Sequence, residues 1–224
     1  FARLASRGHA VRLPPTPRQL SMVRLHANYG LQVTMHAFAS GGAVVDGTPI
    51  EALAQAITRH RVNALVIPPA ILAQFVAGLP GDAGPFPSLG YVEVSGGRLT
   101  GRLARHAIVR VSPHIHVLYG STECGVVTHS PWQEIAGRPG AAGRLMPGGV
   151  EVAVVDANGA PLPRGSEGRL RFRGATCARG YADGSGPNEP FRDGWFESGD
   201  LGHVDPDGML VIAGRDDERI NIGG

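Results

Sequence analysis

Residues 116–125 read HVLYGSTECG, and the chemistry of this stretch changes after its third residue. A short apolar run gives way to an aromatic ring, a glycine, two hydroxyls and a carboxylate. We predict a buried strand over 115–118 that leaves the core at a ligand site; an ordinary polar loop is the alternative. The candidate site residues in this stretch are Tyr119, Gly120, Ser121, Thr122 and Glu123.

The segments upstream of this stretch alternate between two patterns. Short apolar runs at 43–47, 62–67 and 91–94 are each followed by apolar residues at helical spacing. We expect Thr48 to cap the first of these helices, with Pro49 at its first position and Glu51 completing a capping box. The helical stripes are Ile50, Leu53, Ala54 and Ile57; then Ile71, Leu72, Phe75 and Val76; then Leu99, Leu103, Ala104 and Ile108.

This alternation is typical of parallel βαβ units, in which ligands bind at the carboxyl ends of the strands. The run 91–94 ends in Ser95-Gly96-Gly97, where glycine allows a backbone to approach a ligand closely. If this strand lies beside the strand at 115–118, the polar groups that follow both strands converge on one crevice.

The pattern changes after about residue 137. Valines alternate with other residues over 150–154, and turn sequences occur at 156–159 and 205–208. The predicted fold is therefore α/β, with a parallel βαβ lobe over 1–137 and a smaller antiparallel β-barrel-like lobe over 138–213.

Composition excludes several classes of function. The net charge of +2 is spread over interspersed arginines and acidic residues, so we expect no nucleic-acid partner and no polybasic membrane patch. No apolar run approaches the roughly 18 residues of a membrane span.

Cys124 and Cys177 have no metal or redox spacing; a reduced pair in a cytoplasmic protein is the expectation, and a disulfide stays open. All 21 basic residues are arginine, so any step that needs a lysine must find it outside these residues.

The candidate residues suit a nucleotide. A tyrosine ring can stack on a base, hydroxyls can hold a phosphate oxygen, and a carboxylate can bind Mg²⁺. Asp200 can accept bonds from ribose hydroxyls, or it is a turn aspartate; Arg215 can pair with a phosphate, or it lies on the surface. His114 and His116 are too few for a metal site, and Asp205 and Asp207 are expected to be turn residues.

Taken together, five motifs resemble those of the adenylate-forming superfamily, which includes acyl- and aryl-CoA ligases, nonribosomal adenylation domains and beetle luciferases. Residues 118–123 resemble Y-G-x-T-E, and 95–99 resemble S-G-G-x-x-L. Residues 194–200 resemble G-W-x-x-T-G-D with Ser198 for threonine, and 214–217 resemble G-R-x-D. Residues 168–181 resemble G-E-L…G…G-Y with Arg169 for glutamate.

The resemblance implies a role for each candidate. Tyr119 would stack on adenine, Thr122 would contact the α-phosphate, Glu123 would bind Mg²⁺, and Asp200 would hold the ribose. Arg215 would reach the ribose or phosphate. Asp217 would be the hinge to a C-terminal lid, which residues 214–224 would begin. The remaining nucleotide-site residues would be Ser95, Gly96, Gly97, Gly120 and Ser121, with 95–97 also lining the acyl pocket.

The implied reaction is attack of a small-molecule carboxylic acid on the α-phosphorus of ATP, which gives an acyl-adenylate and pyrophosphate. CoA or a phosphopantetheinyl acyl carrier protein would then accept the acyl group.

Some elements of the family are missing from these residues. The family's glycine-rich phosphate loop is not recognisable before Arg18, and its lid lysine would follow Gly224. Asn221 stands where many family members carry another lysine. We therefore expect a piece of a longer enzyme, inactive alone. A non-catalytic nucleotide-binding module and an interaction scaffold are the alternatives.

The segment that would meet the acid is 24–31. It has no acidic residue to hold an α-amino group, and Ala27-Asn28-Tyr29 resembles the His-Asn-Tyr of aryl-acid-activating enzymes. The segment also resembles the F-A-Y-G-L of benzoate-type CoA ligases. With the small residues Cys124 and Gly125 on the other side, we predict a pocket for an aryl or modest acyl acid. Alternatively, Asn28 is only a polar residue at a helix start.

Overall fold

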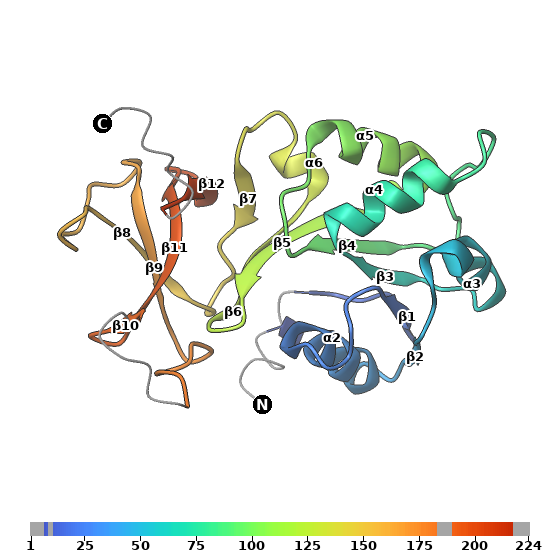
Figure 1. Ribbon diagram of the computed structural model, residues 1–224, viewed down its shortest axis with the longest axis horizontal. Coiled ribbons are helices and arrows are strands. Elements are labelled where there is room, and N and C mark those ends of the chain that lie inside the picture. Colours follow the sequence, from blue (N-terminus) through green and yellow to red (C-terminus); the bar gives the residue numbers. More distant parts are fainter. Residues whose placement is uncertain (1–6, 9–10, 183–189, 217–224) are drawn as a thin grey trace.

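Two sheets organise the computed structural model, which describes residues 7–8, 11–182 and 190–216 (Figure 1). The first sheet has the order β2-β1-β3-β4-β5-β6. Its first five strands are parallel, and β6 runs antiparallel to β5. The strand bounds are β1 Arg18–Ser21, β2 Ala43–Val45, β3 Ala64–Ile67, β4 Tyr91–Ser95, β5 Ile115–Ser121 and β6 Gly125–Pro131.

Helices cover both faces of the first sheet, with α4 and α5 on one face and α2 on the other (Figure 1). Alternation within β1 shows the two faces: Leu20 packs into the cluster formed with α3, α4 and α5, while the Gln19 amide donates to the Val33 carbonyl of α2. The helix bounds are α2 Asn28–Ala39, η1 (a 3-10 turn) Ile50–Ala52, α3 Leu53–Arg59, α4 Pro69–Gly78, α5 Gly101–Arg110 and α6 Trp132–Ile135.

The second sheet is antiparallel and has the order β7-β12-β11-β9-β8, with β10 paired to β11. Leu170 and Phe172 on β9 are both 1% exposed and form the centre of its core. The predicted α/β class with a parallel lobe and an antiparallel β lobe is therefore confirmed. The bounds are β7 Ala141–Arg144, β8 Glu151–Val155, β9 Gly168–Arg173, β10 Phe191–Arg192, β11 Trp195–Val204 and β12 Met209–Arg215.

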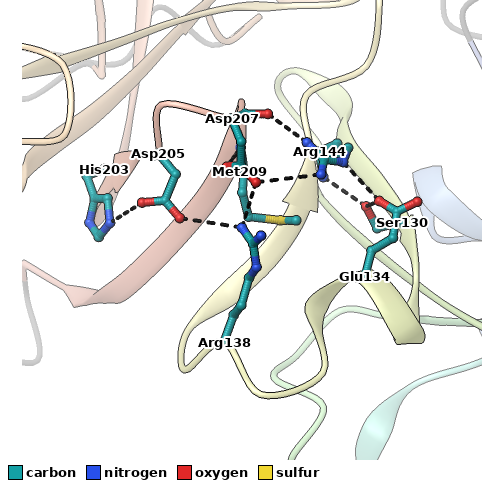
Figure 2. Close-up of polar contacts among 8 residues, drawn as sticks. All are labelled: Ser130, Glu134, Arg138, Arg144, His203, Asp205, Asp207 and Met209. Carbon is teal, nitrogen blue, oxygen red and sulfur yellow. Dashed lines mark hydrogen bonds and ion pairs between the residues drawn. The ribbon is translucent and has the colours of Figure 1, made fainter.

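A polar cluster fastens the second sheet to the first (Figure 2). Arg144 on β7 bonds the Glu134 carboxylate of α6 at 3.0 Å and the Asp207 carbonyl in the β11–β12 turn at 2.6 Å. Its backbone N–H donates to the Ser130 hydroxyl of β6. Arg138 pairs with Asp207 at 2.8 Å, and that bond holds the pKa of the Asp207 carboxyl below its usual range. Arg144 thus links the consecutive elements β6 and α6 to the β11–β12 turn, which lies 63 residues further along the chain.

Two local predictions are wrong. Thr48 does not cap the helix, because the first helical hydrogen bond joins Ala52 N–H to the Pro49 carbonyl and places the cap position at Pro49. The strand predicted over 115–118 is also too short. β5 runs on through Tyr119, Gly120 and Ser121, which pair with β6. Tyr119, Gly120 and Ser121 therefore lie on a strand, and Thr122 and Glu123 lie in the turn of the β5–β6 hairpin.

The division into lobes at 137/138 stays a prediction; an isolated bridge between Thr128 of β6 and Leu145 after β7 crosses it. Asp217 and Asn221 lie outside the described residues. Within the part of the chain that the structure describes, no helix has the length and apolar character needed to cross a bilayer.

Candidate functional site

Tyr119, Asp200 and Arg215 meet where the two sheets approach each other. The Tyr119 hydroxyl donates to an Asp200 carboxylate oxygen at 2.5 Å, and Arg215 donates to the other oxygen at 3.2 Å. The Tyr119 ring packs against Phe172 of β9, with centroids 6.1 Å apart. Burial and the nearby Asp200 carboxylate raise the pKa of Tyr119, so its hydroxyl stays a donor.

Glycines let the backbone take up this geometry. The register of β5 against β6 shifts between Tyr119 and Gly120, and a Cβ at Gly120 would lie 2.2 Å from the Gly125 carbonyl oxygen. Gly199, before Asp200, has a φ of 74°, which favours glycine. Asp200 and Arg215 are direct register partners on β11 and β12. The contact between Tyr119 and Asp200 is therefore flanked by the register shift at Gly120 in the first sheet and by the positive φ of Gly199 in the second.

Glu123 lies in the turn between β5 and β6, and a second segment fastens it. The Tyr181 hydroxyl donates to Glu123 Oε1 at 2.8 Å, and the Ala178 N–H donates to the Glu123 carbonyl at 2.7 Å. Thr122 beside it is exposed. Carboxylate and hydroxyl oxygens are the hard ligands that Mg²⁺ prefers, and Mg²⁺ usually takes one or two protein carboxylates together with substrate phosphates. The donor chemistry of this turn fits such a site.

The segment 95–97 leaves the sheet next to this hairpin. Ser95 of β4 is the parallel partner of Leu118 on β5, which confirms that the two strands are neighbours. Gly96 follows with a φ of 79°. The Ser95 hydroxyl is buried and has no hydrogen-bond partner among the described residues. A buried hydroxyl without a partner is costly, and a ligand group can satisfy it.

Ala27 and Asn28 begin α2, with Ala27 at the N-cap position. The next residue, Tyr29, donates its hydroxyl to the Glu93 carboxylate of β4. Glu93 and Ser95 point to the same face of β4, because side chains alternate along a strand. The start of α2 therefore covers the face that carries Ser95, although no contact described here assigns Asn28 itself a role.

The Glu93 carboxyl is buried on this face. It accepts bonds from Arg7 at 2.7 Å and from the Tyr91 hydroxyl at 2.6 Å, and both members of the Arg7–Glu93 ion pair are nearly inaccessible. Burial raises the pKa of Glu93, while the Arg7 guanidinium opposes that rise. Breaking such a buried pair leaves an uncompensated charge, which typically costs about 3–5 kcal/mol.

Cys124 is fully buried beside Phe172, and its sulfur lies 2.9 Å from that of Cys177. The Cys177 contact and burial raise the pKa of the Cys124 thiol. Gly125 begins β6 with a φ of 76°. Whether Cys124 and Gly125 border an acyl pocket stays a prediction.

Sequence reasoning assigned no role to Glu93, Arg7 or Tyr181. Glu93 had a signal, because a lone carboxylate within the apolar run YVEVS implies a buried partner. Arg7 had no signal. Tyr181 ends the G-Y motif, but the motif does not relate it to Glu123, since Arg7 and Tyr181 reach their carboxylates only through the tertiary fold, across 86 and 58 residues respectively.

The two-sheet fold and the contact of Tyr119, Asp200 and Arg215 agree with the adenylate-forming class that the sequence motifs resemble. A family model described as AMP-binding enzyme matches residues 2–182, and the chain belongs to this family. The family resemblance drawn from the motifs is thus confirmed.

Two curated relatives are informative. The chain is 32% identical over 216 residues to Enterobactin synthase component E of Escherichia coli (strain K12), covering 92% of this chain and 40% of the relative. It is 33% identical over 210 residues to the 2-hydroxy-7-methoxy-5-methyl-1-naphthoate–CoA ligase of Streptomyces carzinostaticus, covering 88% and 36%. The chain therefore spans about two-fifths of the length of these relatives.

Solved structures share the fold. The O-succinylbenzoate Coenzyme A Synthetase of Bacillus subtilis, in complex with ATP and magnesium ion, superposes with a TM-score of 0.83 at 20% identity. The match covers 99% of this chain and 46% of that protein.

Proposed function

We propose that this chain supplies the nucleotide site of an ATP-dependent carboxylic acid ligase. The enzyme would join a small carboxylic acid to AMP with release of pyrophosphate, and then pass the acyl group to CoA or to a phosphopantetheinyl carrier protein. A cytoplasmic location suits both ATP and CoA. Membership of the AMP-binding family and the CoA-ligase relatives support the general reaction.

The contact between Tyr119 and Asp200 carries the proposal. An aromatic face next to a carboxylate suits an adenosine, whose base can stack while two ribose hydroxyls donate to the acid. The two residues come from different sheets and are 81 positions apart, yet their side chains lie 2.5 Å apart. Arg215, already bound to Asp200, brings a cation to the same place for a ribose or phosphate oxygen.

Glu123 and Thr122 would serve the phosphate end. Glu123 would bind Mg²⁺, with Tyr181 holding one carboxylate oxygen, and Thr122 would donate to the α-phosphate. The bound metal would neutralise phosphate charge as the acid attacks. The backbone around Gly96 and Gly97 would face the adenine, and Gly120 and Ser121 would complete the nucleotide site.

The acid would lie between the start of α2 and the end of β4. Ala27 and Asn28 begin the helix, and the unpartnered Ser95 hydroxyl offers a polar contact. Cys124 and Gly125 are small, which suits an aryl or modest acyl group. The naphthoate named for one relative is an aryl acid, which supports this class. A hinge at Asp217 and a lysine-bearing lid from outside these 224 residues would complete the enzyme.

Carboxylate-dependent ATP–pyrophosphate exchange on the full-length protein tests the proposal, with aryl and fatty acids compared. We expect exchange with an aryl or short acyl acid, and at least a tenfold loss on Asp200→Asn. Glu151→Gln is the matched control, because Glu151 is an exposed carboxylate on β8 paired only with Arg173 in the contacts described. Nucleotide binding without exchange for any acid would instead support a non-catalytic module, and the chain alone is expected to show no exchange.

A further inference from the structure

Cys124 and Cys177 are brought together by segments that are distant in sequence. Cys124 lies in the β5–β6 turn, and Cys177 follows β9, 53 residues later. Their sulfur atoms are 2.9 Å apart, compared with about 2.05 Å in a disulfide bond. Both residues are present as thiols.

The backbone already holds the two segments together. The Ala178 N–H donates to the Glu123 carbonyl at 2.7 Å, directly beside both cysteines, and the Cys177 N–H donates to the Gly174 carbonyl. The Ser121 hydroxyl accepts from the Cys124 N–H on the other side. A bond between the sulfurs would therefore require only a small closure, not a rearrangement of the chain.

An oxidant can reach one of the two thiols. Cys124 is fully buried, whereas Cys177 is partly exposed and lines a cavity of about 420 Å³ between its own segment and the β10–β11 hairpin. Asymmetric exposure of this kind is the arrangement in which an accessible cysteine reacts first and a neighbouring cysteine resolves it.

We propose that Cys124 and Cys177 form a reversible, redox-dependent clamp, with hydrogen peroxide as the oxidant. The Cys177 sulfur attacks the peroxide oxygen and becomes a sulfenic acid, and one water leaves. The Cys124 sulfur then attacks the sulfenic sulfur, forms the S–S bond and releases a second water. Together the two thiols lose two protons and two electrons, which reduce one hydrogen peroxide to two waters; a dithiol reductant reverses the change.

The clamp would act next to the proposed metal ligand, because Cys124 follows Glu123 and Ala178 binds the Glu123 carbonyl. It would tie the β5–β6 turn to the segment that leads to Tyr181. Closing a loop of this length restricts the unfolded chain, so the oxidised form should unfold at a higher temperature. The clamp would form whether or not the enzyme has the proposed ligase activity.

Peptide mapping after treatment of the folded chain with hydrogen peroxide tests the clamp. We expect an intramolecular link between the peptides of Cys124 and Cys177, removed by dithiothreitol, and a rise in the thermal midpoint of roughly 5 °C or more. The link should form at least tenfold faster in the folded chain than in guanidinium. Equal rates in both, or oxidation only to sulfinic acids or intermolecular dimers, would overturn the proposal.

Two single variants separate the roles of the cysteines. Cys124→Ser should accumulate a sulfenic acid at Cys177, which dimedone traps. Cys177→Ser should react at least tenfold more slowly, because the remaining thiol is buried. Equal trapping in both variants would contradict the assignment of Cys177 as the residue that reacts first.

Discussion

At the scale of single residues, Tyr119 is positioned before any ligand arrives. Its hydroxyl is held by Asp200 and its ring packs against Phe172. A side chain fixed in this way loses little conformational freedom when a base stacks on it. The ring and the hydroxyl can be separated by mutation, because phenylalanine keeps one and loses the other.

Replacing Tyr119 by alanine should weaken AMP binding by roughly 5- to 150-fold, since loss of base–aromatic stacking costs about 1–3 kcal/mol. Tyr119→Phe should keep most of the affinity because it retains the ring. Calorimetric titration of both variants with AMP measures the difference. Equal losses in both would show that the hydroxyl, not the ring, carries binding.

Tyr181 should matter for the metal and not for the base. Tyr181→Phe removes the hydroxyl bonded to Glu123 but keeps the ring that packs edge-on against Phe191. We expect the Mg²⁺ concentration that gives half-maximal ATP binding to rise roughly threefold to tenfold. The variant loses the hydrogen bond to the Glu123 carboxylate at a partly exposed site. AMP affinity without metal should not change. A uniform loss in both measurements would indicate a structural role.

At the scale of elements, the β5–β6 hairpin determines where the candidate site residues Tyr119 to Glu123 lie. The sequence correctly predicts a strand beginning at Ile115, but the chain stays extended through Ser121 because β6 supplies antiparallel partners for polar residues. That pairing depends on the adjacent strand 125–131, which sequence reasoning did not predict. Helix α2 was anticipated only through the alternative in which Asn28 stands at a helix start, and α2 does begin at Asn28.

Gly120→Ala tests the hairpin directly. The new Cβ would lie 2.2 Å from the Gly125 carbonyl oxygen, so the strands must separate. We expect a loss of roughly 1–3 kcal/mol in unfolding free energy, typical of overpacking, measured by urea denaturation. Gly78→Ala is the control, because a Cβ there meets nothing within 4 Å at the end of α4. Comparable stability of the two variants would refute the close approach.

At the scale of the whole molecule, the two sheets are joined by contacts that no local pattern contains. Arg144 and Arg138 connect β6, α6 and β7 to the β11–β12 turn (Figure 2). Asp205 and Asp207 were expected to be turn residues, and they also accept these arginine contacts. The pairing of Tyr119 with Asp200 depends on the same packing of the sheets. Sequence reasoning placed both residues in one site only through family resemblance, since spacing alone cannot relate residues 81 positions apart.

We expect the free energy of unfolding to fall at low pH because of one buried histidine. His36 on α2 is 5% exposed, and burial together with Arg7 lowers its pKa to about 4. Below the ordinary pKa of about 6.5, the unfolded chain therefore binds a proton at this histidine that the folded chain does not bind. The contribution of neutral His36 to the free energy of unfolding is complete above pH 6.5 and is lost as the pH falls toward 4. We expect a cost of about 2 kcal/mol at pH 5 from this residue.

Urea denaturation between pH 7.5 and pH 5 measures this effect, and His36→Gln provides the comparison because glutamine does not titrate. The variant should lose less stability over that range than the unaltered chain does. The same pH dependence in both proteins would show that His36 is not the responsible group.

Tyr119 and Asp200 are proposed to form an adenosine site. Calorimetric titration of the folded 224-residue chain with AMP, beside its Asp200→Asn variant, tests it most directly. We expect one AMP to bind per chain and the affinity of the variant to be at least tenfold weaker, with cooperative unfolding retained. Equal AMP affinity of the two folded proteins, or no binding to the unaltered one, would contradict it.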